Sequence, residues 1–138
     1  MQLEFVGRLD RARWMEACFF IMTELDATSL YVIRRHRDLK AIYGDAPAAV
    51  QSAQAYFMKQ LEWVSRRLSS EASYLTGRQF TTADILLTTC LVWAAAQRFP
   101  LNDSCMAYLQ RATQRQAYCS AYAANHPAVL QSSTVRGE

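Results

Sequence analysis

Along the pattern of apolar and polar positions, the segment most informative about the fold runs from Ile85 to Ala96 and contains no charged residue. A helix without charge on any side is typical of a helix enclosed by other elements. Just before this segment, Thr81 is followed three residues later by Asp84, which is the spacing of a capping box at a helix start. The pattern therefore predicts a buried central helix over residues 81–97.

The residues around the predicted cap agree on one helix start. Phe80 before the cap and Ile85 after it have the spacing of a hydrophobic staple. Asp84 sits where the helix dipole is positive and can accept the backbone N–H of Thr81. A buried acid can also be a catalytic group, but capping boxes are common, so we favour a structural role for Asp84.

Two long helices are predicted before this segment. The first is expected over about 7–37, and the second starts at Asp45 with Pro47 in its first turn and extends to about residue 68. Three-and-four spacing gives the first helix the core stripe Cys18, Ile21, Met22, Leu25, Ser29 and Val32. The second helix has the clearest amphipathic pattern in the chain, with its own apolar stripe at Val50, Ala53, Phe57, Leu61, Val64 and Leu68.

Two shorter helices are predicted after the central one, which should end near Pro100. Asn102 or Asp103 caps the fourth helix, and a fifth is expected over about 117–124. Amphipathic helices flanking an apolar one form a bundle with the apolar helix as its axis. We therefore expect an all-α, five-helix bundle.

Composition supports one helical domain. The chain has 138 residues, 51% of them hydrophobic, and only four glycines and three prolines. The sequence becomes polar after residue 125, so we expect a helical domain over 1–125 and a flexible tail over 126–138. The apolar run is too short to cross a membrane, and no secretory signal is visible, so we expect a cytoplasmic protein.

Charge and cysteine spacing exclude several kinds of site. The net charge is +3, and its main concentration is the cluster at residues 34–37, RRHR. Cations at a helix C-terminus complement the helix dipole, and we favour this interpretation over nucleic-acid binding. The four cysteines have neither CxxC spacing nor a nearby His, so we expect reduced thiols and no metal site.

Two separate motifs carry a resemblance to a known family. The residues TG, RQF and TTADILLT at 76–88, followed by Trp93, resemble the segment leading into the central helix of the C-terminal domain of glutathione transferases. The segment FFIMTELDATSLYVIRRH at 19–36 resembles the first helix of that domain, especially in bacterial members with TEL at this place. The resemblance runs from about Arg11 to Asn125 and implies that the Thr81 and Asp84 pair is the family's folding cap.

The resemblance implies that the family's activity is divided between two halves of the protein. Family members carry a thioredoxin-like half that binds glutathione and supplies the catalytic Tyr, Ser or Cys, and this half is absent from these residues. We therefore name no catalytic residue and expect no cofactor in this chain. Glutathione is implied only if a thioredoxin-like half is supplied.

The helical half of the family shapes the pocket for the electrophilic co-substrate. By resemblance, the first helix and the end of the central helix line this pocket, which gives the candidates Phe19, Thr23, Asp26, Leu30, Tyr31 and Trp93. A face of aromatic and aliphatic side chains with one acid suits an apolar ligand that has a polar group. The alternative is that the same face only packs on the other half, and Trp93 by itself fits a core position.

This sequence departs from the bacterial pattern at two of these positions. Many bacterial relatives carry His directly after TEL and Asn seven positions earlier, both near glutathione, where this chain has Asp26 and Phe19. An acid repels the carboxylates and thiolate of glutathione. We therefore expect no close glutathione contact from Asp26.

Three functions remain open for this chain. The preferred one is the helical half of a glutathione transferase, which is not catalytic by itself. The others are a free-standing interaction or dimerisation module and a carrier of apolar ligands. The expected partners are a second copy, or another domain that covers the first helix, together with a small apolar electrophile. No membrane or nucleic-acid partner is expected.

Overall fold

The computed structural model describes residues 7–68 and 73–126. Within these ranges the first long helix is built from consecutive segments, which are α1 (Arg8–Phe20), η1 (Ile21–Leu30), α2 (Tyr31–Ile33) and η2 (Arg34–Asp38), followed by the short α3 (Lys40–Tyr43). The later helices are α4 (Pro47–Leu68), α5 (Thr82–Ala96), α6 (Asp103–Thr113) and α7 (Gln116–Asn125). Residues 1–6 and most of the predicted tail, 127–138, lie outside the described residues, so the predicted boundary at 125 stays a prediction.

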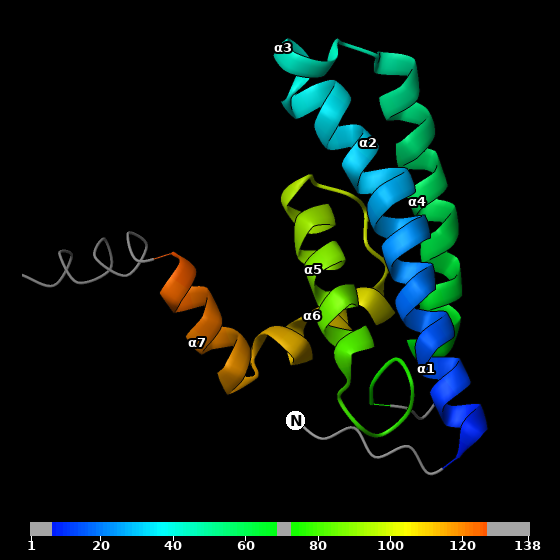
Figure 1. Cartoon of the computed structure of the whole chain (residues 1–138). Helices are drawn as coiled ribbons and strands as arrows, with labels where there is room; N and C mark the ends of the chain where they lie inside the picture. Colours follow the sequence, from blue (N-terminus) through cyan, green and yellow to red (C-terminus); the bar gives the residue numbers. More distant parts are fainter. Residues whose placement is uncertain (1–6, 69–72, 127–138) are drawn as a thin grey trace, which may run out of the picture.

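The two longest helical runs form an antiparallel pair (Figure 1). The segments from α1 to η2 pack against α4, and the rings of Phe20 and Trp63 stack across this contact with centroids 4.1 Å apart. The chain reverses direction after α3 at Gly44, whose φ of 86° favours glycine. α5 packs against η1, α1 and α6, whereas α7 points away from the bundle at the end of α6 (Figure 1).

The middle of the first helix has π-helical hydrogen bonding. In η1 the bonds join residues five apart, and the Ser29 hydroxyl repeats this spacing by donating to the Glu24 carbonyl at 2.8 Å. The buried residues of η1 are Ile21, Leu25, Ser29 and Leu30. Met22, which the predicted stripe places in the core, is 43% exposed. Met22 follows the buried Ile21 by one residue, roughly 100° around the helix, and so falls outside the buried face.

The structure differs from the predicted start of α4 and agrees with the predicted start of α6. α4 begins at Pro47 instead of Asp45, because proline is suited to the first helical position, and the Asp45 carboxylate lies 3.8 Å from the Lys40 ammonium. α6 begins as predicted after Asn102, whose side chain accepts the Cys105 N–H at 3.0 Å. The buried stripe of α4 also follows the prediction from Ala53 onward.

The prediction that α5 is a central, largely buried helix is confirmed, since seven of its residues are buried. The prediction that it has no solvent-facing side is wrong. Ile85 is 48% exposed and Thr89 is exposed as well. This side is open because α7 stands away from it, and no residue of α7 is buried in the described part of the chain (Figure 1).

Candidate functional site

The N-terminus of α5 is held by a fully buried carboxylate. Asp84 has no exposed surface, and its Oδ2 accepts the N–H of Thr81 at 2.8 Å and the Thr81 hydroxyl at 3.1 Å. Its Oδ1 accepts the N–H of Leu75 at 2.9 Å and the hydroxyl of Tyr108 at 2.8 Å. Both arms of the capping box between Thr81 and Asp84 are present.

These bonds give Asp84 a structural role. Each oxygen takes two donors, so the carboxylate ties together the loop before α5, the start of α5 and the middle of α6. Burial, and next the charge of Asp84, raise the pKa of the Tyr108 hydroxyl above its ordinary value. Tyr108 therefore stays protonated and continues to donate to the acid.

The residues predicted for the electrophile pocket lie in three different environments. Phe19 is 64% exposed and Tyr31 is 46% exposed, and Thr23 lies on the surface with its hydroxyl donating to the Phe19 carbonyl at 2.8 Å. Asp26 and Trp93 are half-buried. Leu30 is only 1% exposed and belongs to the hydrophobic core, so the structure separates it from the other candidates.

The half-buried candidates border a seam between the first helix and α5. Burial raises the pKa of the Asp26 carboxyl. The pKa of the Cys90 thiol in α5 is raised to about 12 by burial and, second, by the charge of Asp26. The η1 segment that carries Asp26 packs against α5. One turn further along α5, the Arg34 guanidinium lies 5.9 Å from the centre of the Trp93 ring. Asp26 and Trp93 are thus brought to the same seam.

A comparison with known families and structures assigns this architecture. The profile of the family described as "Glutathione S-transferase, C-terminal domain" matches residues 47–118, just over half of the chain. The chain belongs to this family. The structure is also similar to a crystal structure of a glutathione transferase from Methylococcus capsulatus str. Bath, with a TM-score of 0.71 and 25% sequence identity. That match covers 88% of this chain and 57% of the other protein, and no curated protein sequence matches.

The expected fold and family are therefore confirmed for this glutathione transferase C-terminal domain. The chain spans 57% of the length of the glutathione transferase that it resembles. Among the described residues, no helix is long and apolar enough to cross a membrane, and no group of His, Cys, Asp and Glu could hold a metal ion.

The outer side of the first helix carries an exposed apolar stripe that sequence reasoning missed. Met15, Phe19 and Met22 are 40%, 64% and 43% exposed, and their spacing places them on one side of α1 and η1. The three-and-four spacing was visible in the sequence, but Met22 was assigned to the core. Such a stripe is unusual on a surface that faces only water.

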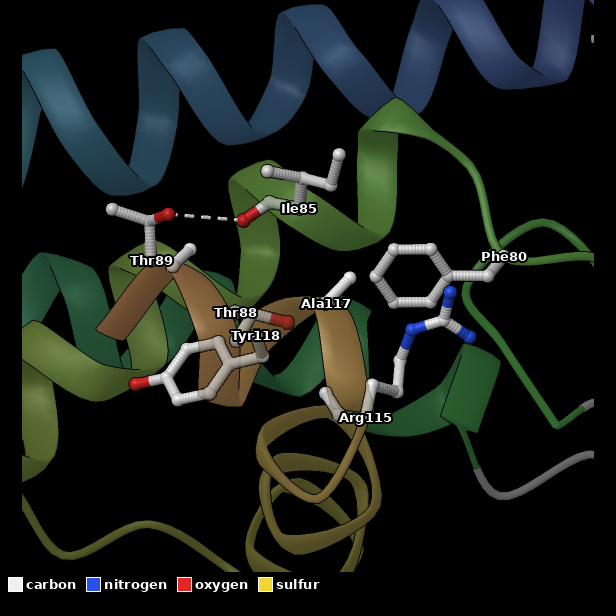
Figure 2. A pocket seen from close by; sticks show the side chains of 9 residues that line it. Phe80, Ile85, Thr88, Thr89, Arg115, Ala117 and Tyr118 are labelled. Atoms are coloured by element: carbon white, nitrogen blue, oxygen red, sulfur yellow. Dashed lines mark hydrogen bonds between the residues drawn. The ribbon is translucent and has the colours of Figure 1, made fainter. Parts of the chain in front are cut away.

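A second feature that the sequence did not reveal is a groove between α5 and α7 of this glutathione transferase domain. One part of it is a pocket of about 230 Å³ whose lining includes Phe80, Ile85 and Arg115 (Figure 2). The staple residues Phe80 and Ile85 thus line the same pocket. An available signal was the sequence of α7, which contains no charged residue from Gln116 to Asn125.

Proposed function

We propose that this chain is the helical half of a glutathione transferase-like protein and that it shapes the site for a small apolar electrophile. In this proposal the chain is not catalytic by itself. A thioredoxin-like half binds glutathione and activates its thiol. The family match and the 57% coverage of a glutathione transferase support this division of labour.

The observation that carries the proposal is the surface of the first helix together with its seam against α5. Phe19 and Thr23 are exposed on that helix, and Asp26 and Trp93 border the seam. Exposed apolar side chains next to a few polar groups are typical of a ligand site at a domain interface. A second half lying on this surface would turn it into a closed pocket.

Asp26 determines which ligands suit this surface. It is the acid among the candidate pocket residues, so it accepts hydrogen bonds from a ligand and repels ligands that carry carboxylates. We therefore propose that glutathione, which is anionic, is held by the other half and that the helical half contacts the apolar co-substrate. The raised pKa of Asp26 is consistent with its partial removal from water.

The test measures binding of dinitrobenzene, an unreactive aromatic nitro compound, by quenching of tryptophan fluorescence. Phe19→Asp should weaken binding about tenfold because it places a charge on the apolar face. Ile42→Asp is the matched control, since Ile42 is 73% exposed on α3, and it should leave binding unchanged. Equal affinities for the wild type and Phe19→Asp would refute the proposed site.

The same preparation tests whether the chain is catalytically silent. With glutathione and chlorodinitrobenzene, the rate should equal the uncatalysed rate, because no residue of this chain is assigned to thiol activation. Turnover that scales with the concentration of the chain would contradict the division of labour. An engineered fusion of this chain to a thioredoxin-like half is the positive control for this assay.

A second candidate is a free-standing dimerisation module, or an apolar-ligand carrier derived from the domain. The observation that favours it is the exposed stripe of Met15, Phe19 and Met22, which a second copy would cover. Sedimentation velocity should then show a dimer that Met15→Asp dissociates. A monomer at all concentrations would exclude the dimerisation module, and dinitrobenzene binding by that monomer would favour the carrier.

We also propose that the protein works in the cytoplasm. All four cysteines lie in the described part of the chain and all are free thiols. Free thiols are typical of reducing compartments. Localisation of a tagged full chain would test this placement.

A further inference from the structure

We propose that the end of the bundle around α3 binds the surface of an anionic membrane. This α3 end consists of residues 34–45, where the first helix reverses into α4, together with residues 97 and 98 after α5. Figure 1 shows α3 at the opposite end of the helix pair from the start of α1. Thr23 lies about three helical turns before Arg34, so the inference does not depend on the proposed electrophile site.

The α3 end carries the positive charge of the chain. Arg34 and Arg35 are exposed, and neither forms an ion pair with a carboxylate in residues 7–68 and 73–126. The exposed Arg98 belongs to the same end, because the side chain of its neighbour Gln97 donates to the Asp38 carboxylate at 3.4 Å. The net charge of this end is +3, which equals that of the whole chain. It comes from the five cations Arg34, Arg35, Arg37, Lys40 and Arg98 and the two acids Asp38 and Asp45.

Aromatic rings lie beside the two exposed arginines of this end. The Arg35 guanidinium is 4.6 Å from the centre of the Tyr43 ring and 5.7 Å from that of the Tyr31 ring. The Arg34 guanidinium is 5.9 Å from the centre of the Trp93 ring. A ring holds a guanidinium in place but supplies no oxygen acceptor, so the N–H donors of both arginines remain available to phosphate groups.

An exposed aliphatic side chain lies among these charges. Ile42 in α3 is 73% exposed, which is the largest value among the exposed large hydrophobic residues of the described ranges. Tyr43 beside it is 45% exposed, and no residue of α3 is buried. At a membrane surface an aliphatic side chain enters the acyl boundary, a tyrosine lies at the level of the headgroups, and arginines pair with lipid phosphates. The α3 end supplies all three.

The side chains of the α3 end favour a lipid surface over a nucleic acid. Bases stack on the open faces of aromatic rings, but the Arg35 guanidinium already lies over the Tyr43 ring. Ile42 offers no stacking surface, whereas its burial in the acyl boundary is favourable. An anionic membrane therefore accounts for both the charge and the exposed isoleucine.

The proposed contact is peripheral. The sequence led us to expect no membrane partner because its apolar run is too short to cross a bilayer, and no helix in the described parts of the chain could span one. Binding to a membrane surface requires no spanning helix. The proposed cytoplasmic location is compatible with it, because the cytoplasmic leaflet carries anionic lipids.

The experiment is co-sedimentation of the full chain with vesicles of equal parts phosphatidylcholine and phosphatidylglycerol and, separately, with vesicles of phosphatidylcholine alone. The wild type should bind the anionic vesicles about tenfold more tightly, and added salt should weaken this binding. Arg35→Gln should weaken it about fivefold, and Arg35→Lys, which keeps the charge, should retain most of it. The matched control is Arg11→Gln, which removes the same charge from an exposed position near the other end of the first helix and should leave binding unchanged.

A second pair of variants tests the apolar part of the contact. Ile42→Asp should weaken binding to the anionic vesicles about tenfold, because a carboxylate is repelled by the lipid phosphates and cannot enter the acyl boundary. Leu9→Asp is the matched control, since Leu9 is 61% exposed in α1, and it should leave binding unchanged. Ile42→Trp should strengthen binding, because tryptophan prefers the interface between membrane and water. A gain of binding cannot arise from a failure to fold.

Three outcomes would overturn the proposal. These are equal binding of the wild type to the two kinds of vesicle, no binding to either, and losses in Arg11→Gln and Leu9→Asp as large as those in Arg35→Gln and Ile42→Asp. A titration with single-stranded polyuridine identifies the competing partner. If polyuridine binds, Arg35→Gln weakens this binding and Ile42→Asp strengthens or retains it, while the vesicles do not bind, then the α3 end belongs to a nucleic acid.

Discussion

The two sides of α5 are alike in sequence and opposite in structure. On one side Asp84, Leu87 and Leu91 are fully buried, and the acid has donors from three segments of the chain. On the other side Ile85 is 48% exposed, and Thr89 lines an open groove. From Ile85 to Ala96 neither side carries a charge. The absence of charge therefore indicates that α5 is removed from water on both sides. It does not distinguish a side covered by the fold from a side covered by a ligand.

The difference assigns separate roles to the two sides. The buried side fixes the start of α5 and packs it against α6 and the first helix, so changes there act on the free energy of unfolding. The open side makes fewer contacts with the fold, so changes there should act mainly on binding. Substitutions on the two sides can test this separation directly.

The largest effect is expected for Asp84→Ala. The substitution leaves the N–H groups of Leu75 and Thr81 and the hydroxyl of Tyr108 without their acceptor in a buried site. We expect a loss of roughly 3 to 5 kcal/mol in the free energy of unfolding, measured by urea denaturation. Asp103→Ala, at an exposed acid in the first turn of α6, should lose less than about 1 kcal/mol. Equal losses in the two variants would mean that the buried bonds do not hold the helix.

The next effect compares the two opposite sides of the same helix. Leu87→Ala removes a fully buried side chain and should lower the free energy of unfolding by about 3 kcal/mol. Ile85→Ala removes a half-exposed side chain and should lower it by less than about 1 kcal/mol. Thermal and urea unfolding of both variants measure the contrast. If the two losses were equal, the open side of α5 would be covered in solution.

A smaller effect is expected for Tyr108→Phe. It removes the hydroxyl that donates to Asp84 at 2.8 Å but keeps the ring, so the loss should be roughly 2 kcal/mol at neutral pH. A chemical denaturation curve at pH 7 measures it. A loss below the error of the measurement would show that another donor replaces the hydroxyl.

The pH dependence of stability provides a further test on the buried side. The pKa values of Tyr108 and Cys90 are raised in the fold, that of Cys90 from 9.0 to about 12, because burial favours the neutral forms. Their contribution to stability is therefore complete below their ordinary pKa values. It falls as the pH rises above 9.0 for Cys90 and above 10.0 for Tyr108. The melting temperature should decrease above pH 9, less steeply in Tyr108→Phe, and a flat profile would contradict the assigned burial.

Local signals in the sequence were sufficient for much of the fold. The spacing of Thr81 and Asp84 predicts the start of α5, and the side chain of Asn102 predicts the start of α6, because caps are short-range interactions. The donors from Leu75 and Tyr108 to Asp84 were not predictable. They come from a loop and from another helix, and only the tertiary fold brings them to the acid.

The candidate site was harder to predict, for a geometric reason. The π-helical bonding of η1 changes the number of residues in a turn, so an α-helical projection misplaces positions towards the end of η1. Leu30, the last residue of η1, was expected in the pocket and lies in the core. Met22 was expected in the core and is 43% exposed, because it lies outside the face that Ile21 and Leu25 bury. The groove beside Arg115 depends on the direction of α7, for which the sequence gives no local rule.

The central claim is that the surface formed by the first helix and α5 receives an apolar electrophile. The most direct measurement is a titration of the isotope-labelled chain with dinitrobenzene, followed by amide NMR shifts. The account predicts shifts at Thr23 and Asp26, with the amides of Leu75 and Asp84 unchanged. Shifts confined to Trp93, Tyr118 and Ala121 in the groove between α5 and α7, or no shift at any of these residues, would contradict it.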